Sequence, residues 1–489
     1  NLIRWLTVVK MRVDEKFVLG CPTIIYLNNV YTIDCFVGTL TIITSGMHYG
    51  WPSPSLPILE RLENSTFSIS PDEGSWIAVM PLIVALIGAL LAASIVDILG
   101  RKRTIIATCL PFFAAWIMIA FSHSLPVLYV ARFIAGVADG LAFTVVPMYI
   151  GEIADPKIRG LLGSGVSTSW IFGILLINVV GSYLSITTTA LVSSVVPILA
   201  LLTFIWMPES PYHHVMKGEF EEAKKSLQVL RGRDDVDNEL SRVSKAVIAQ
   251  TQNTGKFLDL FTTKSNRKAV YIIMVLRGAQ QFSGATAITF YTQSIFKEAG
   301  EDISSELATI IYYTVQFLLN ILCNSIVDKA GRRPLLILSL LGSALALFVE
   351  GTYFFIKTQT TIDVAPFSFL SVISLIGFVV FFSSGMQSIP ILMLGELFPA
   401  NVKAFALCLA DIYFCVIATV VSKFFQIVKD SFGIYVPFYA FTGSCLLGLV
   451  FIVLFVPETK GKSLEEIQVF LGGKVGKDGK DERSERVDV

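Results

Sequence analysis

Charged residues are scarce in this chain and are confined to a few segments. The 489 residues include 38 Lys and Arg and 38 Asp and Glu, so only 16% are charged while 54% are apolar. Soluble domains are about 25% charged. Residues 1–16, 208–268 and 457–489 hold 41 of the 76 charges. Soluble domains could not tolerate so little charge over the rest of the length, so the sequence predicts an integral membrane protein embedded in a lipid bilayer.

Features that define other classes of protein are also missing. The net charge is zero and no basic stripe is present, which argues against a nucleic-acid partner. The seven cysteines are scattered, so neither a disulfide framework nor a metal site is expected. No nucleophile elbow or phosphate-binding loop occurs, so we expect neither an enzyme nor a cofactor. No signal peptide is recognisable, and because the chain begins at Asn1 we expect further N-terminal residues to precede it.

Long apolar stretches are abundant. A helix that crosses a bilayer needs about 20 mainly apolar residues. Twelve such stretches cover residues 29–50, 75–96, 104–122, 126–147, 161–183, 187–207, 269–295, 308–327, 335–356, 367–394, 405–427 and 434–456. The predicted fold class is therefore an all-α membrane protein with twelve transmembrane helices.

The charges in the connecting loops predict the orientation of these helices. One set of loops is basic, with Arg101, Arg159 and Lys403, whereas the alternate loops carry acidic residues such as Glu298. Basic loops favour the cytoplasmic side. Both termini and residues 208–268 are therefore expected in the cytoplasm, and the sequon at Asn64 is expected to be a glycosylation site in the first outer loop.

Three motifs occur in the same order in both halves of the chain. They pair Asp97-Ile-Leu-Gly-Arg101 with Asp328-Lys-Ala-Gly-Arg332, Gly151-Glu152 with Gly395-Glu396, and Pro208-Glu209-Ser210 with Pro457-Glu458-Thr459. Duplicated halves with a solute site between them are typical of transporters. The predicted organisation is a cytoplasmic N-terminus (1–28), a six-helix bundle (29–207), a cytoplasmic helical linker (208–268), a second, pseudo-symmetric six-helix bundle (269–456) and a cytoplasmic tail (457–489) that is disordered after about residue 470.

Together with further motifs, these repeats resemble the sugar porter family of the major facilitator superfamily over nearly the whole chain. The further motifs are Arg132-x-x-x-Gly136-x-x-x-Gly140, Pro147-Met-Tyr-x-Gly-Glu152, Gln280-Gln281-Phe-Ser-Gly284 and Pro457-Glu-Thr-Lys-Gly461. The segment Tyr49-Gly-Trp-Pro-Ser-Pro54 is similar to insect facilitated trehalose transporters. The resemblance implies a major facilitator fold in the cell membrane that moves a sugar by alternating access, and we expect it to act as a monomer.

The resemblance also implies a set of gating salt bridges at the cytoplasmic ends of the helices. In the family, such pairs between helices hold the outward-open state and break when the halves rock. The matching residues are Asp97, Arg101, Glu152, Arg159, Glu209, Asp328, Arg332, Arg333, Glu396, Lys403 and Glu458. Simple positive-inside topology would explain the basic residues but not the repeated spacing of Glu and Arg.

Solute recognition is expected at the seventh predicted span. Gln280 and Gln281 carry amides, which donate and accept hydrogen bonds and therefore suit the hydroxyls of a sugar. The alternative is that these amides only join helices to one another.

Other sugar contacts of the family are altered here. The matching positions hold Ser167, Thr286, the pair Phe290-Tyr291, Gln316, Ile391 in place of a tryptophan, and Phe414. Of these, Ser167, Thr286, Tyr291, Gln316 and Ile391 remain candidate solute-binding residues. Because a lost hydrogen-bond partner can reject a ligand by several kcal/mol, glucose itself is not the expected solute.

Four ionisable residues lie at membrane depth. Because burying an ionisable group there costs free energy, each is a candidate for coupling ion movement to solute transport. They are His48, Asp139, Arg277 and Asp411. His48 alternatively lies at the outer mouth, Asp139 alternatively pairs with Arg132, and Arg277 alternatively pairs with Asp411.

The leading hypothesis is facilitated diffusion of a sugar, such as trehalose, another disaccharide or a hexose, because no Asp occupies the coupling position of the first span. The alternatives are proton-coupled symport through Asp139 or Asp411, a carrier of a non-sugar or anionic solute that uses Arg277, and a sugar receptor that does not transport.

Overall fold

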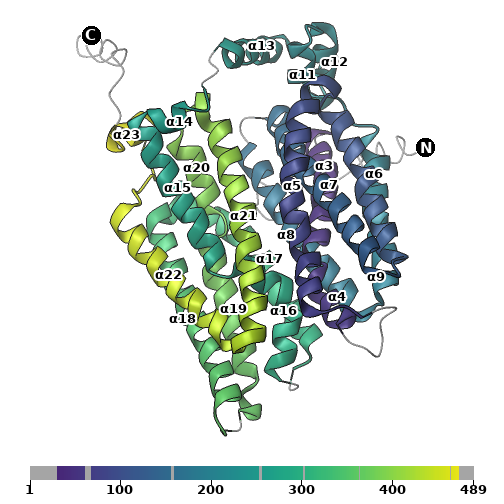
Figure 1. Cartoon of the computed structure of the whole chain (residues 1–489). Helices are drawn as coiled ribbons and strands as arrows, with labels where there is room; N and C mark the ends of the chain where they lie inside the picture. The colour runs from purple at the N-terminus through teal and green to yellow at the C-terminus, as the bar shows by residue number, and fades with distance from the viewer. Residues whose placement is uncertain are drawn as a thin grey trace, which may run out of the picture.

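Two groups of helices stand side by side in the computed structural model, which describes residues 30–60, 68–155, 159–252, 256–300, 303–362, 364–462 and 464–472 (Figure 1). Within these ranges the chain is helical and contains no strand. We call helices α3–α10 the N-half and α15–α22 the C-half, and the contact surface between them the seam. The end of the bundles that carries α11–α13 is called the linker end (Figure 1).

Close backbone contacts hold the N-half together. Its helices are α3 (Val30–Gly50), α4 (Pro52–Leu59), α5 (Pro71–Leu99), α6 (Arg101–Ala120), α7 (Leu125–Ile153), α8 (Arg159–Tyr183), α9 (Ile186–Ser193) and α10 (Val195–Phe204). A Cβ atom on Gly140 of α7 would lie 2.0 Å from the carbonyl oxygen of Ala85 on α5, and one on Gly173 of α8 would lie 2.2 Å from that of Ile43 on α3. Only glycine permits this approach, as in membrane helices generally.

The C-half repeats the pattern with two interrupted spans. Its helices are α15 (Lys264–Phe282), α16 (Ala285–Ala299), α17 (Ser305–Ala330), α18 (Arg332–Gln359), α19 (Phe369–Ser384), α20 (Ile389–Leu397), α21 (Ala400–Phe432) and α22 (Tyr435–Phe455), with a 3₁₀ turn at Ala365–Phe367. The predicted span 269–295 is not one helix, because Gly284 separates α15 from α16. Gly284 has φ +82°, and a Cβ there would meet Phe441 at 2.3 Å.

Short helices cover the linker end. They are α11 (Pro211–Met216), α12 (Phe220–Arg231), α13 (Asp237–Gln252) and α14 (Asp259–Thr262), and α23 (Leu464–Phe470) follows the last long helix. α12 ends at Gly232, which has φ +63° and adopts the left-handed conformation common at helix C-termini. Arg231 donates to the carbonyl of Ile153 at the end of α7 and pairs with Glu239 of α13. The linker helices are thereby attached to the N-half.

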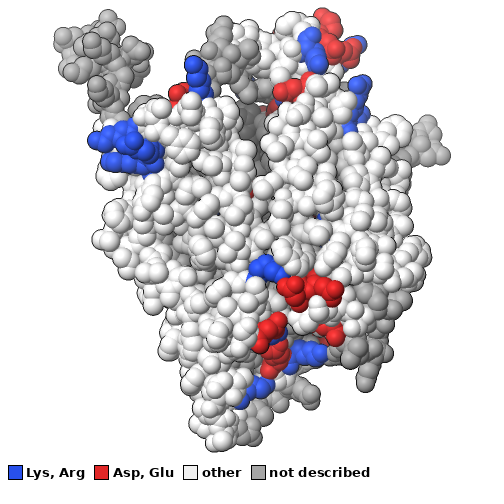
Figure 2. Space-filling model, viewed as in Figure 1, with Lys and Arg blue, Asp and Glu red and all other residues white. Residues whose placement is uncertain are grey.

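Ten helices among the described residues are long and apolar enough to cross a membrane. In Figure 2 the charged side chains lie near the two ends of the visible face and leave an uncharged band between them. Such a band is what a bilayer-spanning protein presents to lipid. The fold is therefore that of an all-helical, multi-pass membrane protein. The predicted glycosylation site at Asn64, the N-terminus 1–28 and the tail beyond residue 472 lie outside the described residues.

Candidate solute pathway and gates

At the end opposite the linker, an ion pair joins the two halves. Lys423 of α21 donates to Asp72 at the start of α5 over 2.6 Å and to the hydroxyl of Ser75 over 2.7 Å. The ammonium also lies 4.3 Å from the ring centre of Trp76. No other ion pair is recorded between the halves in the parts of the chain that the structure describes. The sequence analysis missed Lys423, although a lone lysine in an apolar stretch is itself a signal.

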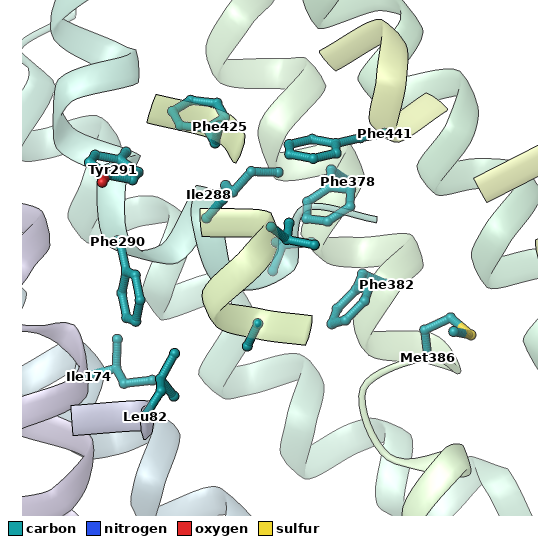
Figure 3. Close-up of a cluster of buried hydrophobic side chains, with 14 of the residues drawn as sticks. Leu82, Ile174, Ile288, Phe290, Tyr291, Phe378, Phe382, Met386, Phe425 and Phe441 are labelled. Carbon is teal, nitrogen blue, oxygen red and sulfur yellow. The ribbon is translucent and has the colours of Figure 1, made fainter. Parts of the chain in front are cut away.

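Aromatic side chains continue this contact toward the middle of the seam. The ring centre of Tyr49 on α3 lies 4.9 Å from that of Phe290 on α16. Phe290 points from the C-half toward Leu82 and Ile174 of the N-half (Figure 3). These contacts hold the two halves together on the side of the seam away from the linker.

A chain of hydrogen bonds crosses the seam beside these rings. The Tyr49 hydroxyl donates to Thr286 over 3.0 Å, and the Thr286 hydroxyl donates to Oε1 of Gln281 over 2.6 Å. No hydrogen bond from Gln281 Nε2 is recorded among the described residues. Two of the predicted solute residues, Gln281 and Thr286, are therefore brought together with Tyr49 at the boundary between the halves.

Gln280 has a different role from Gln281. Its Nε2 donates to the carbonyls of Met386 and Gln387, over 2.8 and 3.1 Å, in the break between α19 and α20. Its Oε1 accepts from Arg277 over 3.1 Å. The amide is thus occupied by bonds within the C-half, which matches the helix-joining alternative.

The remaining predicted solute residues have no recorded hydrogen bond to Gln281, Thr286 or Tyr49 among the described residues. Gln316 of α17 and Tyr291 of α16 are buried, and Gln316 Oε1 and the Tyr291 hydroxyl lack hydrogen-bond partners among the described residues. Ser167 donates to the carbonyl of Ser164 in its own helix over 2.9 Å. Ile391 is 51% exposed on α20, so it does not replace the family tryptophan as a buried contact.

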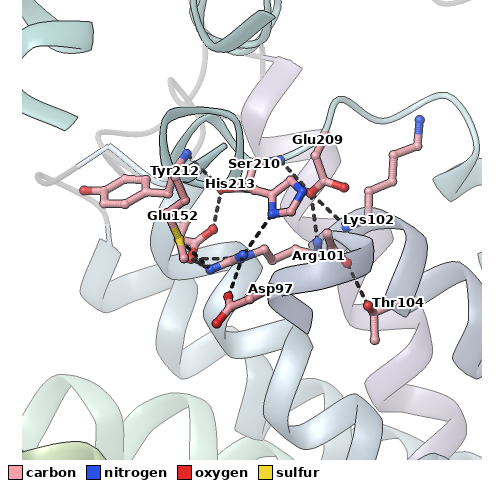
Figure 4. Close-up of polar contacts among 11 residues, drawn as sticks. Asp97, Arg101, Lys102, Thr104, Glu152, Glu209, Ser210, Tyr212 and His213 are labelled. Carbon is pink, nitrogen blue, oxygen red and sulfur yellow. Dashed lines mark hydrogen bonds and ion pairs between the residues drawn. The ribbon is translucent and has the colours of Figure 1, made fainter. Parts of the chain in front are cut away.

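At the linker end of the N-half, Arg101 is the centre of a charge cluster (Figure 4). Its guanidinium pairs with Asp97 at 3.1 Å and with Glu152 of α7 at 3.0 Å. Glu209 accepts from the backbone N–H groups of Arg101 and Lys102, over 2.9 and 3.0 Å. The carboxylate therefore satisfies N–H groups at the start of α6, where the helix dipole also favours negative charge.

The C-half builds the same cluster from the repeated motif. Arg332 pairs with Glu396 at 2.8 Å, and Glu458 accepts from the backbone N–H groups of Arg332 and Arg333 over 3.0 Å each. Thr459 donates to Glu396 over 2.5 Å, as Ser210 donates to Glu152 in the N-half. Partial burial opposes ionisation of Glu458, but the backbone N–H donors outweigh it and lower its pKa.

These clusters join helices to one another, and each cluster belongs to one half. The ion pairs recorded for Arg101 and Arg332 lie within one half rather than across the seam. Lys403 is exposed and donates to the carbonyl of Gly395 over 3.0 Å. The side chains of Arg159 and Asp328 lie outside the described residues. The clusters thus brace each half in this conformation, and the seam at the linker end has no recorded ion pair among described residues.

His48 lies among aromatic side chains within the N-half. It is completely buried, and its ring stacks on Trp116 at 3.9 Å and on Phe112 at 5.5 Å between ring centres. The backbone carbonyl of His48 accepts from Arg132 over 2.7 Å. The aromatic packing of α3 on α6 explains its position.

The other three coupling candidates fall into two sets. Arg277 of α15 pairs with Asp411 of α21 at 2.6 Å, the alternative weighed in the sequence analysis. Asp139 of α7 has no recorded ion pair with Arg132, whose guanidinium instead donates to the carbonyls of Ile77 and His48. Asp139 is only 7% exposed, and its Oδ1 has no hydrogen-bond partner among the described residues.

A further buried acid was missed by the sequence analysis. Glu350 of α18 is completely buried and accepts from the hydroxyls of Ser371 and Ser374 on α19. The signal was available, because a glutamate inside an apolar run is costly unless it has partners.

Solved transporter structures share this architecture. The inward-open structure of the xylose transporter XylE from E. coli matches with a TM-score of 0.75 at 23% identity, covering 90% of this chain and 99% of that one. The structure of the proton:xylose symporter XylE bound to 6-bromo-6-deoxy-D-glucose, a major facilitator protein, matches with a TM-score of 0.70 at 23% identity, covering 90% and 100%. The fold is that of a major facilitator transporter.

Sequence relatives identify the family. The "Sugar (and other) transporter" family model matches residues 35–471, so the chain belongs to that family. It is 34% identical to the facilitated trehalose transporter Tret1 of Polypedilum vanderplanki over 458 residues, covering 93% of this chain and 90% of the relative. It is 35% identical to Tret1 of Apis mellifera ligustica over 434 residues, covering 88% and 86%. The family predicted from the motifs is confirmed, and the protein is a transporter rather than an enzyme.

Proposed function

We propose that the protein carries a sugar of the disaccharide or hexose class, with trehalose the first candidate, across the cell membrane by facilitated diffusion. The observation that carries this proposal is the chain of hydroxyl and amide groups from Tyr49 through Thr286 to Gln281, which crosses the seam between the halves. Such groups both donate and accept, as a polyol requires. The similarity to trehalose transporters supports the choice of solute.

The proposed topology has twelve spans, six in each half, with both termini and the linker helices in the cytoplasm. The basic loops and the position of α11–α13 support this orientation. Asn64 would then carry a glycan in an outer loop. We propose a monomer, because each half finds its partner within the same chain.

In this orientation, the seam is closed on the outer side by Lys423, Asp72, Tyr49 and Phe290. The charge clusters around Arg101 and Arg332 keep each half rigid while the halves rock. A surface ion pair such as Lys423–Asp72 contributes up to about 1 kcal/mol, which biases an equilibrium between two conformations without fixing it.

The alternatives have weaker support. An anionic solute would need Arg277, yet this guanidinium is paired with Asp411 and bonded to Gln280. Proton symport would need a titrating acid, for which Asp139 is the candidate because of its unpartnered Oδ1.

Uptake of radiolabelled trehalose into vesicles that contain the purified protein tests the proposal. We expect uptake that saturates, requires no pH gradient and is inhibited by unlabelled sugars. Gln281→Leu removes the amide at the seam and should reduce uptake about tenfold or more, whereas Gln228→Leu on the linker helix α12 should not. Absence of uptake for every sugar, or uptake only with an inward proton gradient, would contradict facilitated sugar transport.

A further inference from the structure

One face of the N-half carries two layers of side chains at the seam. Ser45 and Tyr49 on α3, and Asp139 and Phe143 on α7, are each four residues apart and therefore share a helix face one turn, about 5.4 Å, from each other. Trp170 of α8 completes the aromatic layer, with its ring centre 4.7 Å from Tyr49 and 6.2 Å from Phe143. A polar layer of Ser45 and Asp139 thus lies beside an aromatic layer.

Each layer contains a buried polar atom that has no protein partner. Among the described residues, no hydrogen bond from Trp170 Nε1 and none to Asp139 Oδ1 is recorded. Buried polar groups in native proteins are nearly always hydrogen-bonded, because an unmet donor or acceptor is costly. An unmet donor in one layer and an unmet acceptor in the adjacent layer indicate a ligand that carries several hydroxyl groups.

The Ser45 hydroxyl and the Arg132 guanidinium both act on the Asp139 carboxyl, yet no hydrogen bond to its Oδ1 is recorded among the described residues. The guanidinium of Arg132 affects Asp139 electrostatically, but its recorded hydrogen bonds go to the carbonyls of Ile77 and His48. Across the seam, Asp139 lies within electrostatic range of Cys415 on α21, so this acid belongs to the boundary between the halves.

The C-half covers this face in the present conformation. Tyr49 contacts both Phe290 and Thr286, which belong to α16. Opening of the seam at the end opposite the linker would separate α16 from Tyr49 and expose the neighbouring ring of Trp170.

We propose that Trp170 and Asp139 form a ring-binding subsite for the solute on the N-half. This inference rests on the proposed sugar-carrier function. The apolar face of a sugar ring packs on the indole, Trp170 Nε1 donates to one hydroxyl, and Asp139 Oδ1 accepts from another. Asp139 is then a recognition group rather than a proton-coupling group, and Trp170 supplies the aromatic surface that Ile391 does not.

Trehalose binding and uptake by the full-length protein in vesicles test the subsite. Trp170→Phe keeps a ring but removes the donor, and we expect the Kd and KM for trehalose to rise about fivefold, with little change in the maximal rate. Asp139→Leu should raise the Kd and the KM more than tenfold. Asp139→Asn keeps an acceptor oxygen and should raise the two constants less. Trp206→Phe, a change at a 74% exposed tryptophan, is the matched control.

The fluorescence of Trp170 gives a second readout that a purely structural role would not change. Trehalose should alter the intrinsic fluorescence of the wild-type protein and of Trp206→Phe, and this change should be absent in Trp170→Phe. Wild-type values of Kd, KM and the fluorescence change in folded Trp170→Phe and Asp139→Leu proteins would overturn the subsite alone. A wild-type protein that neither binds nor carries any sugar would overturn the proposed function together with it.

Discussion

Contacts inside each half differ in kind from contacts across the seam. Inside the halves, glycines bring backbones together, as Gly140 does against Ala85, and buried arginines such as Arg332 pair with acids. Across the seam, the recorded polar contacts are a few hydrogen bonds and the Lys423–Asp72 pair. The first set cannot change without distorting the backbone, whereas the second can form and break. We therefore infer that contacts inside the halves determine folding stability, whereas contacts across the seam determine conformational change.

The largest expected effect comes from a methyl group placed inside a half. Gly140→Ala would put a Cβ 2.0 Å from the Ala85 carbonyl oxygen, so α5 and α7 must separate. We expect a loss of about 1–3 kcal/mol or more in stability, measured as thermal unfolding of the purified protein in detergent. Gly163→Ala is the matched control, because a Cβ there meets nothing within 4 Å and should be neutral or stabilising. Equal stability of the two variants would contradict the close packing.

The next effect is expected at the charge cluster of the C-half. Arg332→Ala leaves Glu396 without its ion pair, and we expect a loss of about 1–3 kcal/mol in stability together with reduced transport. Arg103→Ala, a change at an exposed arginine of α6, should have little effect. The double variant Arg332→Ala/Glu396→Ala should be less destabilised than the sum of its single variants. Additive losses would show that the pair does not couple these residues.

A smaller effect on stability, but a distinct one on conformation, is expected at the seam. Lys423→Gln removes the pair with Asp72 and should cost at most about 1 kcal/mol of stability, yet it should increase the outward-open population. The measurement is the labelling rate of a cysteine introduced at Leu82 by a membrane-impermeant maleimide added outside. Lys357→Gln is the control, since Lys357 binds carbonyls within the C-half. An unchanged labelling rate would show that the Lys423–Asp72 pair does not help to close the seam.

The smallest effect concerns pH. The pKa of Glu458 is lowered in the folded protein, so its ionised form contributes stability above its ordinary pKa of 4.5, and this stability is lost as the pH falls through the lowered pKa. Glu458→Gln should therefore be less stable than wild type near neutral pH, and the difference should shrink below about pH 4.5. Thermal unfolding across this range measures it, and a difference independent of pH would contradict the role of the carboxylate.

Much of the fold could be predicted from sequence because lipid excludes charge. Residues such as Arg101 and Glu152 mark helix ends, and their repetition at Arg332 and Glu396 predicts two related halves. The partners of these residues were harder to predict, because sequence spacing does not say whether a salt bridge closes within a half or between halves.

The candidate solute residues were predicted less well. Gln280 and Gln281 are adjacent and of one chemical type, yet they point to different neighbours because successive helical residues are about 100° apart. Trp170 and Glu350 lie in apolar runs where a sequence pattern does not reveal what the side chain faces.

The break at Gly284 lets α16 move independently of α15. α15 is anchored to α21 and to the α19–α20 connection by Arg277 and Gln280, whereas α16 begins after a left-handed residue and carries Thr286 and Phe290. A movement of α16 about this break would leave α15 in place. A local movement of α16 would open the seam beside Tyr49 without a rotation of the two halves, so these two movements are separable steps.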